Sequence, residues 1–216
     1  MIYFKHLIAI LKKEINNTLP GKEAHKLMRP DISFTEENNA RKSSILILLY
    51  PEENEIKTLL ILRKEYNGFH SHQISFPGGK FEDFDKSLID TALREAHEEI
   101  GIDINSIKII GQLTSLYIPI SNFLVFPLLG YSYNKPILKK NNFEVEKIIE
   151  INISDLLNPV NIKEGEFLVQ DRKVKAPFYN INNYKIWGAT AMIISELLEI
   201  IKKVNTVIET DALQQS

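Results

Sequence analysis

The sequence predicts an α/β protein built from layers of strands and helices. An apolar run of strand length, SILILLY, occupies residues 44–50, and similar runs follow it. A short strand at residues 73–76 precedes a helix that begins after Ser87 and ends at Gly101. A second strong helix, residues 187–204, carries apolar side chains at helical spacing. Strands mixed in this way with a long crossover helix favour a layered α/β domain.

An amphipathic helix is expected at the N-terminus, within residues 1–17. Its lysines lie on the side opposite its apolar residues, and Pro20-Gly21 ends the segment. We expect this helix to pack against the rest of the domain or against a second copy of the chain. Residues 22–42 are polar and charged, and they predict a short helix and a linker. The apolar positions of the first helix are Phe4, Leu7, Ile8, Ile10 and Leu11.

The central part of the chain is expected to supply the sheet. Apolar runs of strand length recur between turn signals, and a short helix at residues 154–157 stops before Pro159. We divide the chain into an N-terminal helical extension (1–39), a single domain (40–204) and a flexible polar tail (205–216). The strands expected after the first are residues 57–63, 73–76, 107–116, 122–133, 143–151, 166–174 and 176–181.

Composition and charge argue against several classes of function. Lys and Arg total 26 against 28 Asp and Glu, so the net charge of -2 gives no support to a nucleic-acid-binding surface. The chain has no cysteine, which excludes disulfides, a thiolate nucleophile and a thiolate zinc site. No secretory signal is apparent, and we expect a cytoplasmic protein. The uncharged stretch between Lys108 and Lys135 could span a bilayer, but Pro119 and Pro127 favour two buried strands joined by a turn.

The helix between Ser87 and Gly101 has a signal at each end. Ser87, with Asp90 three residues later, is a capping pair that starts a helix, and Gly101 suits a left-handed cap that ends it. Apolar residues inside the helix recur every three or four positions, so they form one stripe that faces the rest of the protein. These residues are Ile89, Ala92, Leu93, Ala96 and Ile100.

Three glutamates lie beside this apolar stripe. At about 100° per residue, Glu98 and Glu99 lie on either side of Glu95, about 60° and about 40° away, so the carboxylates leave one narrow face. Their repulsion costs roughly 0.2–0.5 kcal/mol per pair in an exposed helix. A hard cation such as Mg²⁺ reverses this, because it takes oxygen ligands from carboxylates and substrate phosphates. Three glutamates alone would favour a solvated acidic face, whereas the preceding proline, glycines and acidic loop favour a metal site.

The sequence around these glutamates resembles the Nudix box. Arg94-Glu95-Ala96-His97-Glu98-Glu99-Ile100-Gly101-Ile102 matches its second half, and Gly79 matches its opening glycine. The box has a glutamate six residues after that glycine, where this chain has Asp85. It has seven residues between the acid and the arginine, where this chain has eight, Lys86 to Leu93, similar to the variant box of coenzyme A pyrophosphatases. The resemblance implies a Nudix fold, a mixed β-sheet sandwiched between α-helices.

The resemblance also implies a site for Mg²⁺ or Mn²⁺. Glu95 and Glu99 are expected as primary ligands, Glu98 as a third ligand or one that acts through water, and the carbonyl oxygen of Gly79 as a further ligand. The implied reaction is attack of water on a phosphorus of a pyrophosphate, with a carboxylate that collects the proton of the water. Glu98 is therefore also placed among the catalytic residues.

Two further roles follow from the resemblance. Arg94, which we place with the catalytic set, is expected to be structural and to tie the helix to a loop acid, either Asp85 or Glu82. Family members often draw another carboxylate from a later loop, and Glu144 is the candidate ligand or base, with Glu146 second. An ordinary surface glutamate is an equal alternative for Glu144.

Upstream of the box, the chain resembles a motif of coenzyme A pyrophosphatases. Arg63 and Phe76-Pro77-Gly78-Gly79 match it, whereas the second arginine and internal glycine of the motif fall at Gly68 and His72. The resemblance implies cleavage of coenzyme A or acyl-CoA to 4'-phosphopantetheine and adenosine 3',5'-bisphosphate. The candidate substrate-binding residues are Arg63, His70 and Lys80.

Several alternatives stay open at this point. ADP-ribose, NADH or a dinucleoside polyphosphate is an alternative substrate, since one motif arginine is absent. A nucleotide-binding module that has lost hydrolysis is another alternative, which the three intact glutamates disfavour. We expect a small nucleotide substrate, no nucleic-acid partner and no membrane partner, and the amphipathic ends make a homodimer reasonable. Trp187, which opens the last helix, is expected in the core.

Overall fold

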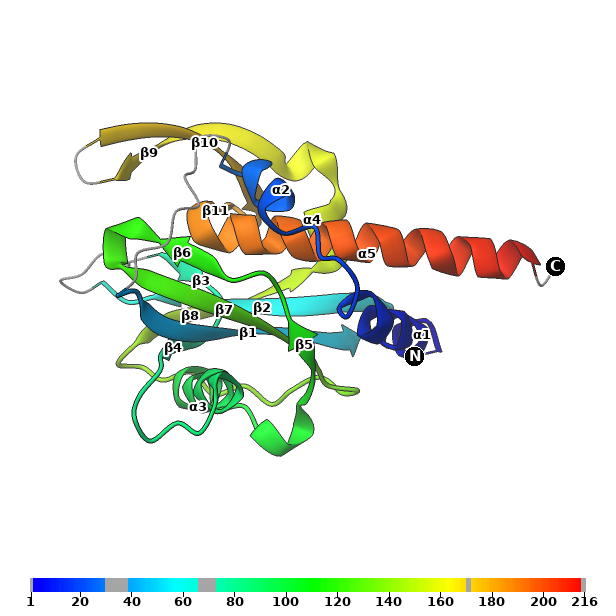
Figure 1. Cartoon of the computed structure of the whole chain (residues 1–216), viewed down its shortest axis with the longest axis horizontal. Coiled ribbons are helices and arrows are strands. Elements are labelled where there is room, and N and C mark those ends of the chain that lie inside the picture. Colours follow the sequence, from blue (N-terminus) through cyan, green and yellow to red (C-terminus); the bar gives the residue numbers. More distant parts are fainter. Residues whose placement is uncertain (1, 30–38, 66–72, 170–171, 215–216) are drawn as a thin grey trace.

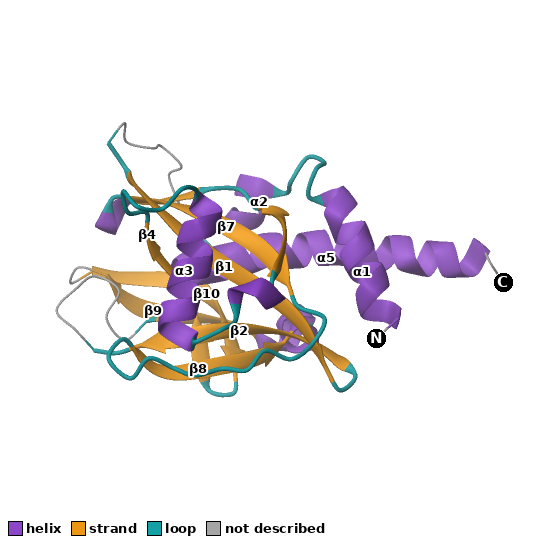
Figure 2. Ribbon diagram, turned by 90° about the horizontal axis from the view of Figure 1, so that it is seen from below, coloured by secondary structure: helices purple, strands orange, loops and turns teal. Residues whose placement is uncertain are grey.

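A mixed β-sheet lies between layers of helices in the computed structural model of the protein (Figure 1). Helix α3 (Leu88–Ile100) covers one face of the sheet, α5 (Gly188–Gln214) covers the other, and α1 (Ile2–Glu14) packs against α5. Figure 2 shows α3 crossing the strands from below. The predicted α/β fold, with a mixed sheet sandwiched between helices, is confirmed. The structure describes residues 2–29, 39–65, 73–169 and 172–214.

The central sheet is eight-stranded in the described part of the chain. Its strands are β1 (Arg41–Glu52), β2 (Glu55–Arg63), β3 (Ile74–Ser75), β4 (Gly78–Lys80), β5 (Lys108–Gln112), β6 (Leu116–Ile118), β7 (Phe123–Tyr131) and β8 (Val145–Asn152). The path is β3-β2-β1-β7-β5, and β4, β6 and β8 pair with β1, β7 and β2 off this path. β1 and β7 are parallel, from Arg41 beside Phe123 to Leu49 beside Tyr131, whereas the other described pairs are antiparallel.

A smaller sheet lies on the side of α5 that faces away from the central sheet (Figure 1). It consists of β9 (Ile162–Val169), β10 (Arg172–Ile181) and β11 (Tyr184–Ile186), in the order β11-β10-β9. The expected single strand at residues 166–174 is wrong, because the antiparallel strands β9 and β10 both contribute to that range. Exposed residues alternate with half-buried ones along β9 and at the start of β10. The sequence pattern therefore gave no sign that the chain reverses its direction between the two strands. The expected strand at residues 176–181 is the second half of β10.

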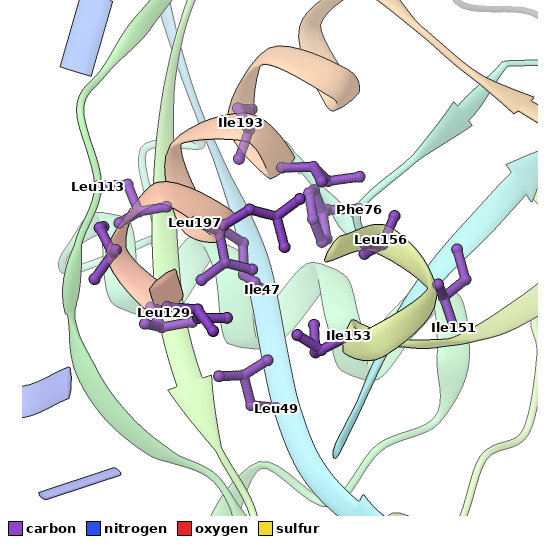
Figure 3. Packing of buried hydrophobic residues seen from close by; sticks show 14 of the residues in the cluster. Ile47, Leu49, Phe76, Leu113, Leu129, Ile151, Ile153, Leu156, Ile193 and Leu197 are labelled. Carbon is purple, nitrogen blue, oxygen red and sulfur yellow. The ribbon is translucent and has the colours of Figure 1, made fainter. Parts of the chain in front are cut away.

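Strand β1 is buried on both faces, which explains its unbroken apolar sequence. Ile47 and Leu49 point into the core beneath α5, where Figure 3 shows them near Leu197. Leu46 and Leu48 alternate with them and belong to the second core, under α3. The first core therefore packs α5 on one face of β1, and the second core packs α3 on the other face and fixes it against the sheet.

Helix α3 begins and ends where the sequence predicts. The hydroxyl of Ser87 accepts a hydrogen bond from the amide of Asp90 at 3.2 Å, as an N-cap residue does. Gly101 has a φ of 66°, and its amide donates to the carbonyl oxygen of His97 at 2.9 Å. Ile89, expected in the apolar stripe, is exposed, so the stripe is shorter than the sequence suggested.

The N-terminal helix packs within its own chain. All five predicted apolar side chains of α1 are buried, in the same core as those of α5. The expected short helix in residues 22–42 is α2 (Gly21–Lys26), which also packs against α5. The expected helix at residues 154–157 is α4 (Ile153–Leu157). Short 3₁₀ turns occupy Ile104–Ser106, Pro119–Ser121 and Pro159–Asn161.

Helix α5 is longer than predicted. It continues to Gln214, where the sequence suggested a flexible tail over residues 205–216. This stretch has neither glycine nor proline, so no residue in it ends the helix. No helix in the described ranges is both long and apolar enough to cross a membrane, and the uncharged stretch after Lys108 supplies β5, β6 and β7. The domain boundaries after residues 39 and 204 stay predictions.

A buried polar cluster joins α2 to α5. The carboxylate of Glu196 accepts hydrogen bonds from the amide of Gly21 at 3.2 Å, the imidazole of His25 at 3.1 Å and the hydroxyl of Thr114 at 2.6 Å. Both Glu196 and His25 are fully buried. Burial alone would raise the pKa of Glu196, but the hydrogen bonds from His25 and Thr114 outweigh it and lower that pKa. The cluster therefore fixes α2 and the loop after β5 to the middle of α5.

We expect Glu196→Ala to lower the free energy of unfolding by about 3–5 kcal/mol, because it leaves the polar groups around it buried without their acceptor. Glu199→Ala is the matched control one turn later on α5. Glu199 pairs with Lys202 near the surface, and such a helix pair contributes about 0.5 kcal/mol or less. Urea unfolding of the two variants measures the difference, and equal losses would show that the buried cluster does not anchor α2.

Candidate active site

The glutamates of α3 lie against strand β4. A sequence such as Pro77-Gly78-Gly79 is typical of a tight turn, but Gly78 and Gly79 pair with Ile45 and Ser44 of β1 as a short strand. A Cβ atom at Gly79 would overlap the carboxylate of Glu95, so only glycine lets this side chain approach the backbone. Gly78 has a φ of 152°, and a Cβ there would overlap the backbone of β1. Gly78 is therefore required for β4 to lie against β1, and Gly79 for the carboxylate of Glu95 to lie against β4.

Arg94 and Asp85 form the ion pair that holds the loop before α3. The guanidinium donates from Nε to Oδ1 and from Nη2 to Oδ2 of Asp85, each at 2.9 Å. The same carboxylate accepts from the amide of Glu82 at 3.0 Å and from the hydroxyl of Thr91 at 2.9 Å. These bonds, with Arg94 foremost, hold the pKa of Asp85 well below its usual range. Of the two loop acids expected to pair with Arg94, the structure selects Asp85 and not Glu82.

Arg94 also draws two of the three glutamates together. Its Nη1 donates to Glu95 at 2.7 Å and to Glu98 at 3.1 Å, so both carboxylates lie next to one positive charge. Burial raises the pKa of Glu95 although the guanidinium opposes it, whereas the side chain of Glu98 is half exposed. The structure therefore gathers Glu95 and Glu98 around the guanidinium of Arg94, and their role as metal ligands stays a prediction.

Glu99 is the buried member of the three. Its side chain is 1% exposed, and its carboxylate accepts from the amide of Gly78 at 2.9 Å and pairs with the guanidinium of Arg63 at 3.0 Å. Arg63 also donates to the carbonyl oxygen of Gly78 at 2.7 Å. Burial nevertheless raises the pKa of Glu99 to about 7, with smaller contributions from the negative charges of Glu95 and Glu144. Arg63, expected to bind substrate, is thus already engaged with Glu99 and β4.

The remaining predicted site residues differ in how close they lie to the three glutamates. Glu144 is exposed, but it lies close enough to Glu99 for its charge to act on that carboxylate. Glu146 is also exposed. The ammonium of Lys80 pairs with Glu82 at 3.2 Å. His70 lies outside the described residues.

The expected metal ligands, the three glutamates and the carbonyl oxygen of Gly79, offer the oxygen atoms that a hard divalent cation binds. Glu95 packs against Gly79, and Glu98 already shares a cationic nitrogen with it. In the described ranges, however, no group of three Asp, Glu or His side chains converges on one point. Arg94 holds Glu95 and Glu98 on one side, while Arg63 holds Glu99 on the other. A cation bound by all three glutamates would have to replace some of their contacts with the two arginines. Glu98 is the exposed member of the three, so its side chain can change position.

A large cavity of about 1010 Å³ opens next to β4. Gly79, Lys80 and Arg63 form part of its wall, so it is continuous with the residues around the glutamates. Trp187 is half-buried in this wall and stacks on Phe167 at 4.2 Å, and its expected place in the core is wrong. The wall residues that the sequence did not indicate as a group include Arg29, Gln73, Ile118, Phe123, Leu168 and Thr190. They come from distant parts of the chain, and no local pattern connects them.

Comparison with known proteins identifies the family. The model of the NUDIX domain matches residues 40–168, which contain β4, α3 and all three glutamates. The chain belongs to the Nudix domain family. It is 32% identical over 163 residues to Nudix hydrolase NudL of Photorhabdus laumondii, which covers 75% of this chain and 86% of the relative. It is 30% identical over 163 residues to chloroplastic Nudix hydrolase 22 of Arabidopsis thaliana, which covers 71% of this chain and 53% of that protein.

A solved structure supports the Nudix fold. The C. elegans Ap4A hydrolase in a binary complex aligns with a TM-score of 0.50 and 14% identity, over 79% of this chain and 98% of that one. At this identity the likeness concerns the fold alone. Family membership shows that the protein is a Nudix hydrolase, which cleaves the diphosphate of a nucleoside diphosphate derivative. Nudix hydrolases use divalent metal cations, in agreement with the oxygen donors beside β4.

We expect Asp85→Asn to lower the free energy of unfolding at pH 7 by about 1–3 kcal/mol, because it removes a charged acceptor from a buried hydrogen-bond set. The folded pKa of Asp85 lies below its unfolded value, so its contribution is complete above the unfolded pKa, about 4. The contribution is lost as the pH falls through the lower folded pKa.

Urea unfolding of both proteins between pH 7 and pH 3 measures this difference in stability. The gap between wild type and Asp85→Asn should narrow below about pH 4. Asp83→Asn, at an exposed position in the same loop, is the matched control. Its free energy of unfolding should stay close to that of wild type at every pH in this range. A gap that stays constant down to pH 3 would contradict the role of the Arg94–Asp85 pair.

Proposed function

We propose that the protein hydrolyses coenzyme A or acyl-CoA at its diphosphate, giving 4'-phosphopantetheine and adenosine 3',5'-bisphosphate. The observation that carries this proposal is the cavity of about 1010 Å³ beside Gly79. Such a volume is at the upper end for small-molecule sites, about 300–1,000 Å³, and suits a long ligand. Ile118, Phe123 and Trp187 in its wall offer apolar surface for an adenine ring and a pantetheine arm.

The residues that resemble the coenzyme A motif form one connected support beneath this cavity. Arg63 donates from Nε to the hydroxyl of Ser75 at 3.3 Å and from Nη2 to the carbonyl oxygen of Gly78. Thr190 at the start of α5 donates to the carbonyl oxygen of Ile74 at 2.8 Å. These bonds hold β3 and β4 at the floor of the cavity, which supports a role for the motif in shaping the substrate site.

Mg²⁺ or Mn²⁺ is proposed as the cofactor, held by Glu95, Glu98, Glu99 and the carbonyl oxygen of Gly79. When bound, such an ion would neutralise charge on the diphosphate oxygens and make the attacking water more acidic. The chain contributes rigidity, because Glu95 packs on Gly79 and Glu99 is fixed by the amide of Gly78. Arg94 keeps the helix in place through Asp85 and acts as a positioning residue.

Glu144 is proposed as the group that takes the proton of the attacking water. It lies within electrostatic reach of Glu99 but is exposed, so its carboxylate can face both solvent and substrate. Glu146 stays the second candidate. Lys80 and His70 remain proposed substrate contacts, and residues 40–204 the proposed catalytic domain.

A substrate panel tests the proposal. Wild-type protein with Mg²⁺ or Mn²⁺ should show its highest kcat/KM with coenzyme A or an acyl-CoA, compared with ADP-ribose, NADH and a dinucleoside polyphosphate. Mass spectrometry of the products should show 4'-phosphopantetheine and adenosine 3',5'-bisphosphate. If coenzyme A is not hydrolysed while another member of the panel is hydrolysed rapidly, that member would replace coenzyme A as the proposed substrate.

We expect Glu98→Gln and Glu144→Gln each to lower kcat by roughly 10²–10⁴-fold with little change in KM, because each removes a charge used in the chemical step. Asp90→Asn removes a carboxylate from the first turn of the same helix and is the matched control. Glu146→Gln should resemble this control. Steady-state kinetics on the best substrate measures these effects. Full activity of Glu98→Gln would show that the glutamates are not the catalytic centre.

A further inference from the structure

The cavity beside β4 is basic. Among the described residues of its wall, three are basic, Arg29, Arg63 and Lys80, and none is acidic. Two of these positive charges are already paired: Arg63 with Glu99, and Lys80 with Glu82. Arg29 has no carboxylate partner within the described part of the chain. Among the described residues of the wall, Arg29 is therefore the basic group that is available to an anionic ligand.

Arg29 is held in place by the segment that carries it. Its amide donates to the carbonyl oxygen of His25 at 3.1 Å, at the end of α2. Ser195 of α5 donates to the carbonyl oxygen of Ala24 at 2.9 Å, and His25 itself is fixed by buried Glu196. Because α2 is anchored to α5 in this way, the backbone of Arg29 is positioned before any ligand binds, which lowers the entropic cost of using it.

Arg29 follows α2, which packs against α5, whereas the glutamates belong to α3. Figure 1 shows α5 and α3 on opposite faces of the central sheet. A diphosphate held at the glutamates is therefore not the natural partner of Arg29. A guanidinium recognises phosphate through two parallel hydrogen bonds, so a separate phosphate group of the ligand suits it better.

We propose that Arg29 binds a phosphate monoester of the substrate that lies outside the diphosphate. This inference rests on the proposed function, since in coenzyme A that group is the 3'-phosphate of the ribose. Arg29 thereby supplies the positive charge for which Arg63, Lys64 and Lys80 are the candidates nearest to the box in the sequence. It makes the substrate site selective for nucleotides that carry the additional phosphate.

Kinetics with a matched pair of substrates tests this role. Coenzyme A and 3'-dephospho-coenzyme A differ only in the phosphate monoester. In Arg29→Ala, KM for coenzyme A should rise about tenfold or more, as expected for loss of a hydrogen bond between charged groups. KM for dephospho-coenzyme A and both kcat values should stay unchanged. Arg29→Lys, which keeps the charge without the planar fork, should lie between Arg29→Ala and wild type.

The control is Lys26→Ala, which removes a positive charge from the exposed side of α2 outside the cavity. It should leave both KM values unchanged, and thermal unfolding verifies that each variant is folded. A loss in Arg29→Ala that is equal for the two substrates, or no loss for either, would overturn the proposal.

Direct binding separates failure of this inference from failure of the proposed function. If wild type hydrolyses neither coenzyme A compound, the proposed function fails, and calorimetry then decides the role of Arg29. Wild type should bind adenosine 3',5'-bisphosphate more tightly than adenosine 5'-monophosphate, and Arg29→Ala should bind both equally. Equal affinity of wild type for the two nucleotides would overturn the phosphate site whatever the substrate is.

Discussion

The arrangement of the site depends on the guanidinium of Arg94, which joins three parts of the chain. It donates to Asp85 in the loop, to the carbonyl oxygen of Lys80 on β4, and to Glu95 and Glu98 on its own helix. An arginine has five N–H donors in one plane, so a single side chain can serve loop, strand and helix at once. An ammonium group has no such fork. The position of Glu95 and Glu98 against β4 therefore depends on this one residue, whereas Arg63 holds Glu99.

Crowding three carboxylates beside a strand opposes folding, and the chain offsets this with two arginines. Arg94 forms ion pairs with Glu95 and Glu98, and Arg63 forms an ion pair with Glu99. The compensation is incomplete, because burial still raises the pKa of Glu99 to about 7. Helix propensity and apolar packing alone would not hold these charges together. The carboxylates are kept in place by fixed positive groups and by Gly79, which leaves room for the carboxylate of Glu95 against β4.

Much of the fold and the centre of the site could be predicted, because their signals are local. The cap at Ser87, the stop at Gly101 and the shared face of the glutamates all lie within one helix. Strand β4 was missed because a Pro-Gly-Gly sequence is typical of turns, and it pairs only through the distant strand β1. Trp187 was assigned to the core because its sequence context says nothing of the cavity that opens beside it. Contacts between distant segments, such as the cluster around Glu196, leave no local pattern.

The cavity wall draws on more of the chain than the carboxylates do. The segment that matches the NUDIX domain, residues 40–168, contains every carboxylate of the proposed reaction centre. The cavity wall is completed from both sides of that segment, by Arg29 before it and by Trp187 to Thr190 after it. The two flanking regions are joined to each other through the buried pair of His25 and Glu196. A substitution that loosens this pair would therefore displace Arg29 and the start of α5, which belong to the cavity wall. The shape of the cavity thus depends on contacts between the two flanking regions as well as on the segment that matches the NUDIX domain.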